Sequence, residues 1–331
     1  ANTKPTVDSE ETLKYILDKG AETGIHVTTC ANVTMGMQGK QLTDMKKLAA
    51  AGAVGFTDDG VPLLDAELVR HAMEISAELD MPISFHEEDP KYIENNGVNR
   101  GKASEYYGIG GSSREAEIAL VERDLKLAEE TGARLHLCHC STKESVELVR
   151  DAKKKGIKVS GEVCPHHFTL TEDDIVEGDA NYKMNPPLRT KADVDALKAG
   201  LRDDIMEVIS TDHAPHTAEE KAKDLKSAPF GIVGMETAAA LTFTELVKTG
   251  YLTPMGMAEK MSTNPARILG INKGDISVGH LADITIFDPK DTYEINAAEF
   301  ASKGKNMPFE GRKVTGRVVG TILDGRIVYQ K

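Results

Sequence analysis

The stretch "STDHAPH" at residues 210–216 places an aspartate and two histidines directly after an apolar run, where a strand should end. Two other apolar runs end in the same manner, in "ISFHEED" at residues 83–89 and "LHLCHCST" at residues 135–142. In parallel α/β proteins, catalytic residues come from the carboxyl ends of several strands. The three stretches therefore indicate a parallel sheet with a site along one edge.

Strand-like runs alternate with amphipathic helical patterns over most of the chain, which predicts a parallel sheet. We expect strands near residues 25–30, 53–57, 82–86, 134–139, 157–163 and 205–210. We expect helices near residues 9–19, 43–51, 65–79, 114–131, 143–155, 192–202, 234–249 and 254–262. For the helix over 114–131, Ser112 and Glu115 predict a capping box, and Gly132 predicts the end of the helix.

The predicted fold class is α/β, a (β/α)8 barrel of the TIM type. No Gly-x-Gly-x-x-Gly fingerprint follows a strand, and the chemical residues lie at the ends of several strands, which favours a barrel over a Rossmann sheet. Only six strands have convincing helices, so we expect the first one or two barrel strands to be missing from this chain. Three long connections, at 87–113, 164–191 and 211–233, leave carboxyl ends of strands, where functional loops are usual.

The end of the chain has a different pattern. From about Gly274, short β runs and turns replace the strand-helix alternation, including an Asp-Gly turn in "TILDGRIVY". We expect residues 1–274 to form the barrel, incomplete at its amino end. We expect residues 275–331 to form part of a small β-rich domain.

Composition excludes several classes of function. The 331 residues carry a formal net charge of −13, which argues against a nucleic-acid partner. No run of about 18 apolar residues is present, so no membrane span is expected. The four cysteines lack Cys-x-x-Cys spacing and are expected to be reduced thiols in a cytoplasmic protein.

Four strand-end residues could meet around a metal ion: Asp59, His86, His139 and Asp212. Singly, each has an ordinary explanation, as a turn residue, a buried histidine or a helix cap. Together they would converge at the barrel mouth, and their nitrogen and oxygen atoms suit Zn²⁺. Such a metal lowers the pKa of bound water from about 15.7 towards about 7, and Asp212 could take the released proton.

The remaining histidines are harder to assign from the sequence. His216 lies four residues after Asp212 and could reach a substrate, whereas His213 could serve only to shape the turn. His136 is expected to be structural. The pair His166 and His167, in "CPHHF", is left open between a structural and a functional role.

Several motifs together resemble the bacterial class I dihydroorotases of the amidohydrolase superfamily. They are "STDHAPH", "NYKMNPPLR", "APFGIVGMET" and "STNPARILG", and the resemblance runs along nearly the whole chain. It implies a barrel enzyme with one or two zinc ions. The small-molecule substrates implied are L-dihydroorotate and N-carbamoyl-L-aspartate, which such enzymes interconvert in pyrimidine (UMP) biosynthesis.

The resemblance also implies metal ligands. Asp59 of "TDDG" matches the aspartate that bridges two metals, and His86 and His139 match two ligands of one zinc. Glu87 stands where the family motif has a cysteine. Asp212 matches the ligand of the other zinc and the carrier that passes a proton to the departing nitrogen, after metal-bound hydroxide attacks the ring amide.

Substrate contacts follow from the same comparison of motifs. Asn185 and His216 match residues that hold dihydroorotate. Phe230 and Gly231 match a loop that closes over the substrate through its backbone, and Asn2 matches a further contact.

One departure from the family is large. The His-x-His of the first barrel strand, and the arginine that follows it, are not in the sequence. The resemblance implies that roughly 90 amino-terminal residues with those ligands are missing, which leaves open whether this chain alone is active. The zinc held by Asp59, His86 and His139 would be retained.

Two alternatives remain. A hydantoinase or allantoinase would usually bridge its metals with a carboxylated lysine, whereas this chain has Thr57-Asp58-Asp59 there. A non-catalytic dihydroorotase-like scaffold for aspartate transcarbamoylase would be expected to lack metal ligands that are present here. A homodimer and an aspartate transcarbamoylase partner are further expectations from the resemblance.

Overall fold

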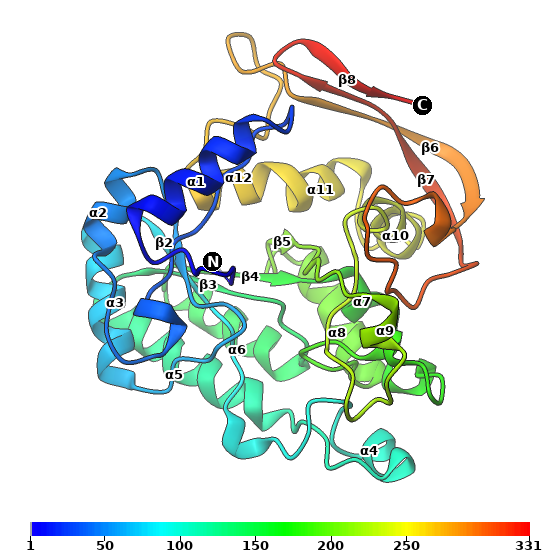
Figure 1. The fold of residues 1–331 in the computed structure, drawn as a ribbon, viewed down its shortest axis with the longest axis horizontal. Helices are drawn as coiled ribbons and strands as arrows, with labels where there is room; N and C mark the ends of the chain where they lie inside the picture. The colour runs from blue at the N-terminus through cyan, green and yellow to red at the C-terminus, as the bar shows by residue number, and fades with distance from the viewer. Residues whose placement is uncertain (1) are drawn as a thin grey trace.

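Five parallel strands form the central sheet in the computed structural model, which describes residues 2–331 (Figure 1). Their order in the sheet is the order in the chain. They are β1 (Phe56–Thr57), β2 (Pro82–Phe85), β3 (Arg134–Leu137), β4 (Val159–Val163) and β5 (Val208–Ile209). A doubly wound Rossmann sheet reverses its strand order at a switch point, whereas a barrel adds each strand beside the previous one. The observed order is therefore that of consecutive strands of a barrel.

Helices connect the strands and cover the outside of the sheet. Successive helices pack side by side, α3 against α5, α5 against α6 and α6 against α8. The helices are α1 (Glu10–Ala21), α2 (Met45–Ala50), α3 (Ala66–Glu78), α4 (Lys102–Tyr107), α5 (Glu115–Thr131), α6 (Lys143–Lys154), α7 (Pro165–Thr169), α8 (Lys191–Arg202), α9 (Ala218–Lys221), α10 (Ala238–Thr242), α11 (Pro254–Ala258) and α12 (Asn264–Leu269). Within residues 2–331, no helix has both the length and the apolar character that crossing a membrane requires.

The strand expected at residues 25–30 is not formed. The chain runs beside β1 there, but the pairing is a single bridge between Ala31 and Phe56. Just beyond it, the Asp58 carboxylate accepts hydrogen bonds from the amides of Val33 and Thr34 at 2.9 and 3.1 Å. These bonds turn the backbone away from the sheet and end the pairing.

The predicted start of α5 was also wrong in detail, although its end was right. The helix begins after Arg114, and no side chain caps it. Ser112 instead takes part in β-bridges with Ile93 and Asn99. Gly132 ends the helix in the left-handed conformation, with φ of 70°, as expected.

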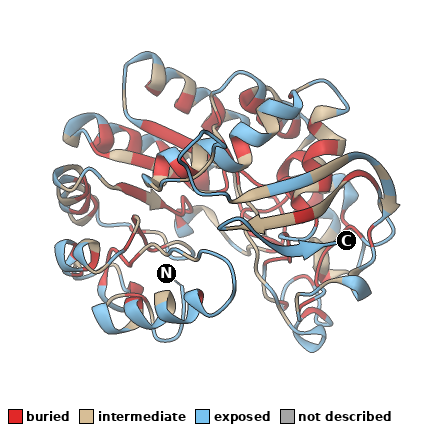
Figure 2. Ribbon diagram, turned by 90° about the horizontal axis from the view of Figure 1, so that it is seen from above, coloured by how far each residue is buried: buried red, intermediate tan, exposed pale blue. Residues whose placement is uncertain are grey.

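A continuous apolar core lies between the sheet and its helices. Its most buried members include Phe56, Ile83, Leu135 and Val163, one from each of four neighbouring strands. Figure 2 shows buried residues concentrated in the strands and on the inner faces of the helices, with exposed residues on the outer faces. This core fixes the relative positions of the strand ends.

The last part of the chain forms a separate antiparallel sheet of β6 (Ile284–Glu294), β7 (Lys313–Leu323) and β8 (Arg326–Gln330). Asp324 and Gly325, with φ of 48° and 75°, make the expected turn between β7 and β8. A second apolar cluster joins Val314 of β7 to residues such as Leu241 of α10 and Leu188. The boundary at residues 274 and 275 stays a prediction.

Replacing Ile83 by alanine should destabilise the barrel sheet. Ile83 is fully buried in β2, between Phe56 and Leu135 of the adjoining strands. We expect Ile83→Ala to lower the free energy of unfolding by about 2–5 kcal/mol, measured by urea denaturation. Ile327→Ala, in β8 with 67% of the residue exposed, is the matched control and should change it by less than about 0.5 kcal/mol. Equal losses in the two variants would contradict this description of the core.

Candidate metal centre

Three side chains meet where β1, β2 and β3 end. Asp59 lies two residues after β1, His86 directly after β2 and His139 two residues after β3. His86 Nδ1 lies 3.0 Å from His139 Nε2, and His139 Nε2 lies 3.1 Å from Asp59 Oδ1. The third side of this triangle, from His86 Nδ1 to Asp59 Oδ1, is 3.6 Å. The sequence prediction that these three residues would meet is in accord with this geometry.

The size of the triangle suits a zinc ion. Zinc binds histidine nitrogen and carboxylate oxygen at about 2.0–2.2 Å in tetrahedral geometry, so two ligand atoms should be about 3.3–3.5 Å apart. The three observed separations lie close to that value. Both imidazoles are buried, whereas 41% of the Asp59 side chain is exposed. The residues therefore fit a divalent ion that is reached from the Asp59 side.

The charges around the triangle favour a cation. Burial lowers the pKa of His139, but the hydrogen bond to Asp59 and the charges of Asp59, Asp212 and Glu162 raise it to about 10. Burial raises the pKa of Asp59, but the two imidazoles outweigh burial and hold that pKa well below its usual range. Two ring nitrogens at this distance are held together by an N–H···N hydrogen bond or by a cation bound to both lone pairs. The acidic groups around the two rings favour the cation.

Asp58, the other aspartate of the "TDDG" turn, makes different contacts from Asp59. Asp58 is buried and its carboxylate is held by the amides of Val33 and Thr34 and by Asn32. Those bonds hold the Asp58 carboxylate against residues 32–34 of the preceding loop. Only Asp59 of the pair is free to face the histidines.

Asp212 lies near the triangle but is not one of its three members. Burial raises the pKa of Asp212, the charge of His139 lowers it, and repulsion from Asp59 and Glu162 raises it. Its backbone is left-handed, with φ of 46°, and so is that of His139, with φ of 32°. Such conformations are unfavourable for these residues and are concentrated at functional sites. Asp212 therefore lies close enough to His139 and Asp59 to interact with their charges.

A carboxylate that the sequence prediction missed orients His86. Glu88 Oε2 accepts a hydrogen bond from His86 Nε2 at 3.2 Å, which leaves His86 Nδ1 for the metal. Asn185 donates to the same Glu88 oxygen at 2.7 Å, and its own Oδ1 is buried without a partner. A carboxylate behind a metal-binding histidine fixes the ring and raises its basicity. The sequence did contain a signal for Glu88: it follows His86 by two residues, directly after a strand.

Glu162 of β4 was missed in the same way. Its carboxylate accepts from the His139 amide at 3.1 Å and from His136 Nε2 at 3.0 Å. His136 is therefore held by hydrogen bonds to Glu162 and Ser160, consistent with the structural role expected for it. Glu162 helps to fix the unusual backbone of His139.

The comparison with known proteins agrees with this geometry. Residues 17–328 match the Amidohydrolase family. The chain belongs to the amidohydrolase family. Curated relatives named dihydroorotase, from Clostridium acetobutylicum and Clostridioides difficile, are each 48% identical. The alignments cover 100% and 99% of this chain and 78% of each relative.

Solved structures confirm the predicted α/β barrel of this amidohydrolase. The L-hydantoinase (dihydropyrimidinase) from Arthrobacter aurescens matches with a TM-score of 0.84 and 25% identity, over 99% of this chain and 76% of that chain. The D-hydantoinase (dihydropyrimidinase) from Thermus sp. matches with a TM-score of 0.80 and 22% identity, over 96% and 73%. At 22% identity the second likeness shows the fold alone.

The residues expected to bind substrate lie on three segments of this amidohydrolase: the start of the chain, the 164–191 connection with Asn185, and the 211–233 connection. His216 Nε2 lies 3.0 Å from the carbonyl oxygen of Phe230. Gly231 has φ of 117°, and a Cβ there would lie 2.6 Å from that of Ala214, so only glycine fits. Asn2 lies elsewhere. Its side-chain amide is beside Gly60, the residue that follows Asp59 in the chain. His216, Phe230 and Gly231 are therefore held together in one connection, apart from Asn2.

A buried lysine holds the Phe230 segment in place. Lys221 Nζ donates to the carbonyl oxygens of Lys183, Pro229 and Gly231 at 3.3, 3.0 and 3.0 Å. Asn306 adds bonds to the carbonyls of Ala214 and Gly231, both at 3.0 Å. The loop therefore has a fixed shape, set by side chains that the sequence analysis did not identify.

Removing Glu88 should weaken metal binding by the amidohydrolase. We expect Glu88→Ala to lower the affinity of the Asp59 site for zinc by about 10- to 100-fold, because His86 loses the partner that orients it. Competition with a chromophoric chelator measures this. Glu94→Ala, with a 69% exposed side chain on the same connection, is the control and should bind zinc as the wild type does. Unchanged affinity in Glu88→Ala would show that Glu88 does not support a metal ligand.

Lys221 should make the free energy of unfolding depend on pH between about pH 8 and 10.5. Burial, with the nearby Lys183 charge, lowers the pKa of Lys221 from 10.5 to about 8. Between these values the folded chain binds fewer protons than the unfolded chain, so rising pH stabilises the wild type relative to Lys221→Met. Urea denaturation of both proteins from about pH 7.5 to 10.5 measures the difference.

Lys223→Met, exposed two residues later, is the matched control for that experiment. It should keep the pH dependence of the wild type. A difference between wild type and Lys221→Met that stays constant across the window would contradict the lowered pKa.

Proposed function

We propose that this chain performs the dihydroorotase reaction, the reversible hydrolysis of the ring amide of L-dihydroorotate to N-carbamoyl-L-aspartate. The single observation that carries the proposal is the triangle of Asp59, His86 and His139 at the ends of adjacent strands. Support for this substrate comes from relatives named dihydroorotase at 48% identity over the chain. The reaction belongs to pyrimidine (UMP) biosynthesis.

We propose Zn²⁺ as the ion, in one or two copies, with Asp59, His86, His139 and Asp212 as its ligands. The mixture of imidazole nitrogen and carboxylate oxygen supports zinc over magnesium or calcium, which prefer oxygen alone. When bound, zinc acts as a Lewis acid on the amide carbonyl and lowers the pKa of water. Asp59 contributes the exposed edge of the triangle, so the substrate would approach from that side.

Asp212 is proposed as the group that moves the proton. Hydrolysis adds the oxygen of water to the ring carbonyl carbon and breaks the carbon–nitrogen bond, so a proton must travel from that water to the leaving nitrogen. The raised pKa of Asp212 brings the carboxyl nearer to neutral pH, which favours both uptake and release of a proton. Its place beside the triangle puts it within reach of both steps.

The remaining residues are proposed to hold the substrate. Asn185 lies against His86 and Glu88 with its carbonyl oxygen unpartnered, which suits an N–H donor of the ring. His216 and the backbone at Phe230 and Gly231 form one unit on the adjoining loop. Asn2 beside Gly60 is the proposed contact at the Asp59 side.

A homodimer, an aspartate transcarbamoylase partner and a cytoplasmic location are proposed from the family resemblance alone. The hydantoinase alternative has one observation in its favour, the TM-score of 0.84 to an L-hydantoinase. The identity of 25% to that protein, against 48% to a dihydroorotase, supports the first choice.

The full-length gene product should hydrolyse L-dihydroorotate in preference to hydantoin and allantoin. Asp212→Asn should lower kcat by about 10²- to 10⁴-fold, because the proton carrier is removed. Absorbance assays of ring opening measure both. Asp195→Asn, half-exposed on α8, is the control and should retain kcat.

Three results would contradict the proposal. Hydrolysis of hydantoin or allantoin alone would favour the alternative enzyme. A zinc-loaded protein that hydrolyses none of the three would favour the scaffold. Full activity in Asp212→Asn would remove that residue from the mechanism while leaving the substrate assignment intact.

A further inference from the structure

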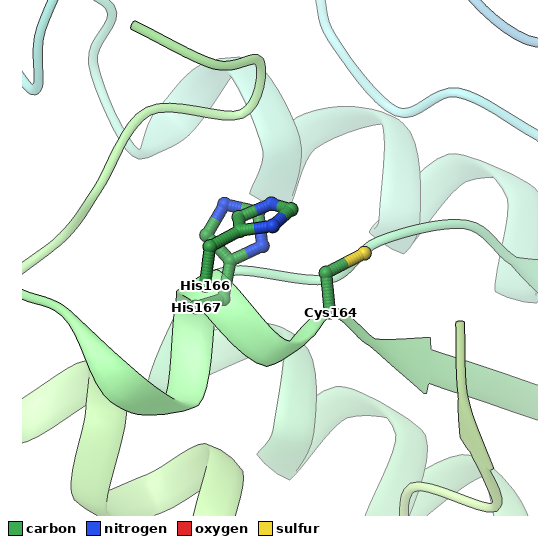
Figure 3. A group of neighbouring side chains, drawn as sticks. All are labelled: Cys164, His166 and His167. Atoms are coloured by element: carbon green, nitrogen blue, oxygen red, sulfur yellow. The ribbon is translucent and has the colours of Figure 1, made fainter. Parts of the chain in front are cut away.

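A second group of metal-binding side chains lies directly after β4. Cys164, His166 and His167 are all buried, and one potential ligand atom of each lies within 4.8 Å of the others. Figure 3 shows the two imidazole rings side by side above α7, with the Cys164 side chain at the end of the adjoining strand. None of these residues belongs to the Asp59 triangle. The sequence left the two histidines without a role.

The hydrogen bonds of His167 are those of a metal ligand. Its Nε2–H donates to the carbonyl oxygen of Pro186 at 2.9 Å, which fixes the tautomer and leaves a lone pair on Nδ1. That Nδ1 atom is buried and has no hydrogen-bond partner. Buried polar atoms are rarely left unpaired, because each costs about 1–3 kcal/mol. An unpaired lone pair in this place indicates a missing partner.

His166 also has a ring nitrogen without a partner. Its Nε2 is buried without a hydrogen-bond partner. Burial lowers the pKa of His166 well below its usual range and that of His167 to about 4, so both rings are neutral at physiological pH. Neutral imidazole is the form that binds metals. Two such rings, each with an unpartnered nitrogen, lie together, with centroids 4.3 Å apart.

Cys164 completes the group. Its Sγ lies 3.4 Å from the Ser210 hydroxyl, which can donate a hydrogen bond to a thiolate. Burial raises the pKa of the free thiol, so without a metal it stays protonated. A coordinated metal removes that proton, and binding therefore releases one proton to solvent.

We propose that Cys164, His166 and His167 form a second zinc site, distinct from the Asp59 triangle. One thiolate and two imidazoles form a mixed sulfur–nitrogen set that selects zinc over magnesium, calcium or manganese. The ligands come from one short segment that starts the connection 164–191. Three protein ligands leave one position of a tetrahedral ion for water.

The ion would act on the shape of the site rather than on the reaction. Binding ties the end of β4 to α7, a helix of only five residues. The second ring nitrogen of His167 already holds the Pro186 carbonyl, directly beside Asn185. Metal at the second site would thus fix the turn that carries a proposed substrate contact.

Cobalt substitution tests the proposal, because only the second site contains sulfur. We expect the metal-free full-length protein, loaded with Co²⁺, to show a thiolate-to-cobalt charge-transfer band. Cys164→Ser should lose the band and bind about one metal equivalent fewer per chain. Cys140→Ser removes another buried thiol, outside the group, and should keep both the band and the stoichiometry.

A measurement on the wild type tests the proposal even if the Cys164→Ser variant fails to fold. X-ray absorption of the zinc-loaded wild type should show a sulfur neighbour at about 2.3 Å. Absence of both the band and the sulfur neighbour would overturn the proposal. So would a band that survives in Cys164→Ser. A sulfur-bound metal in a protein that fails to hydrolyse dihydroorotate would leave this site standing and count against the proposed function alone.

Discussion

The structure around the site depends on one constraint, the meeting of two imidazole nitrogens and a carboxylate oxygen at neighbouring strand ends. Residues 53 positions apart in the chain, His86 and His139, bring their ring nitrogens to 3.0 Å. Parallel pairing of β2 with β3, from Pro82 with Arg134 to Phe85 with Leu137, sets both strand ends at the same level. The buried side chains of Ile83 and Leu135 keep that register, since a slip by one residue would turn each histidine to the other face. The core thus determines the geometry of the site.

The charge of the whole chain has little to do with the charge of this site. A formal net charge of −13 would repel an anionic substrate at long range. Near the triangle, however, the negative groups Asp59, Asp212 and Glu162 raise the pKa of His139 to about 10. Acidic groups that hold a proton so firmly also hold a metal cation. A cation bound there would supply the local positive charge that an anionic substrate requires.

The sequence predicted those parts of the structure that rest on local patterns. Apolar runs and helical periodicity located β1 to β5 and their helices, and residues at strand ends identified Asp59, His86 and His139. The predictions from sequence failed where a side chain distant in the chain determines the local structure. The Asp58 carboxylate binds the amides of Val33 and Thr34, so the pairing beside β1 does not continue past Ala31. Lys221 holds the Phe230 loop through three carbonyl oxygens, and no pattern in the sequence marks that contact.

The two groups of potential metal ligands are linked by one set of contacts. His167 donates to the carbonyl of Pro186, Pro186 follows Asn185 directly in the chain, and the Asn185 side chain donates to Glu88. Glu88 in turn orients His86, whose other nitrogen faces His139. A shift at the start of the 164–191 connection would therefore reach the triangle through hydrogen bonds of 3.2 Å or shorter. The position of this loop therefore helps to set the direction in which the His86 imidazole points.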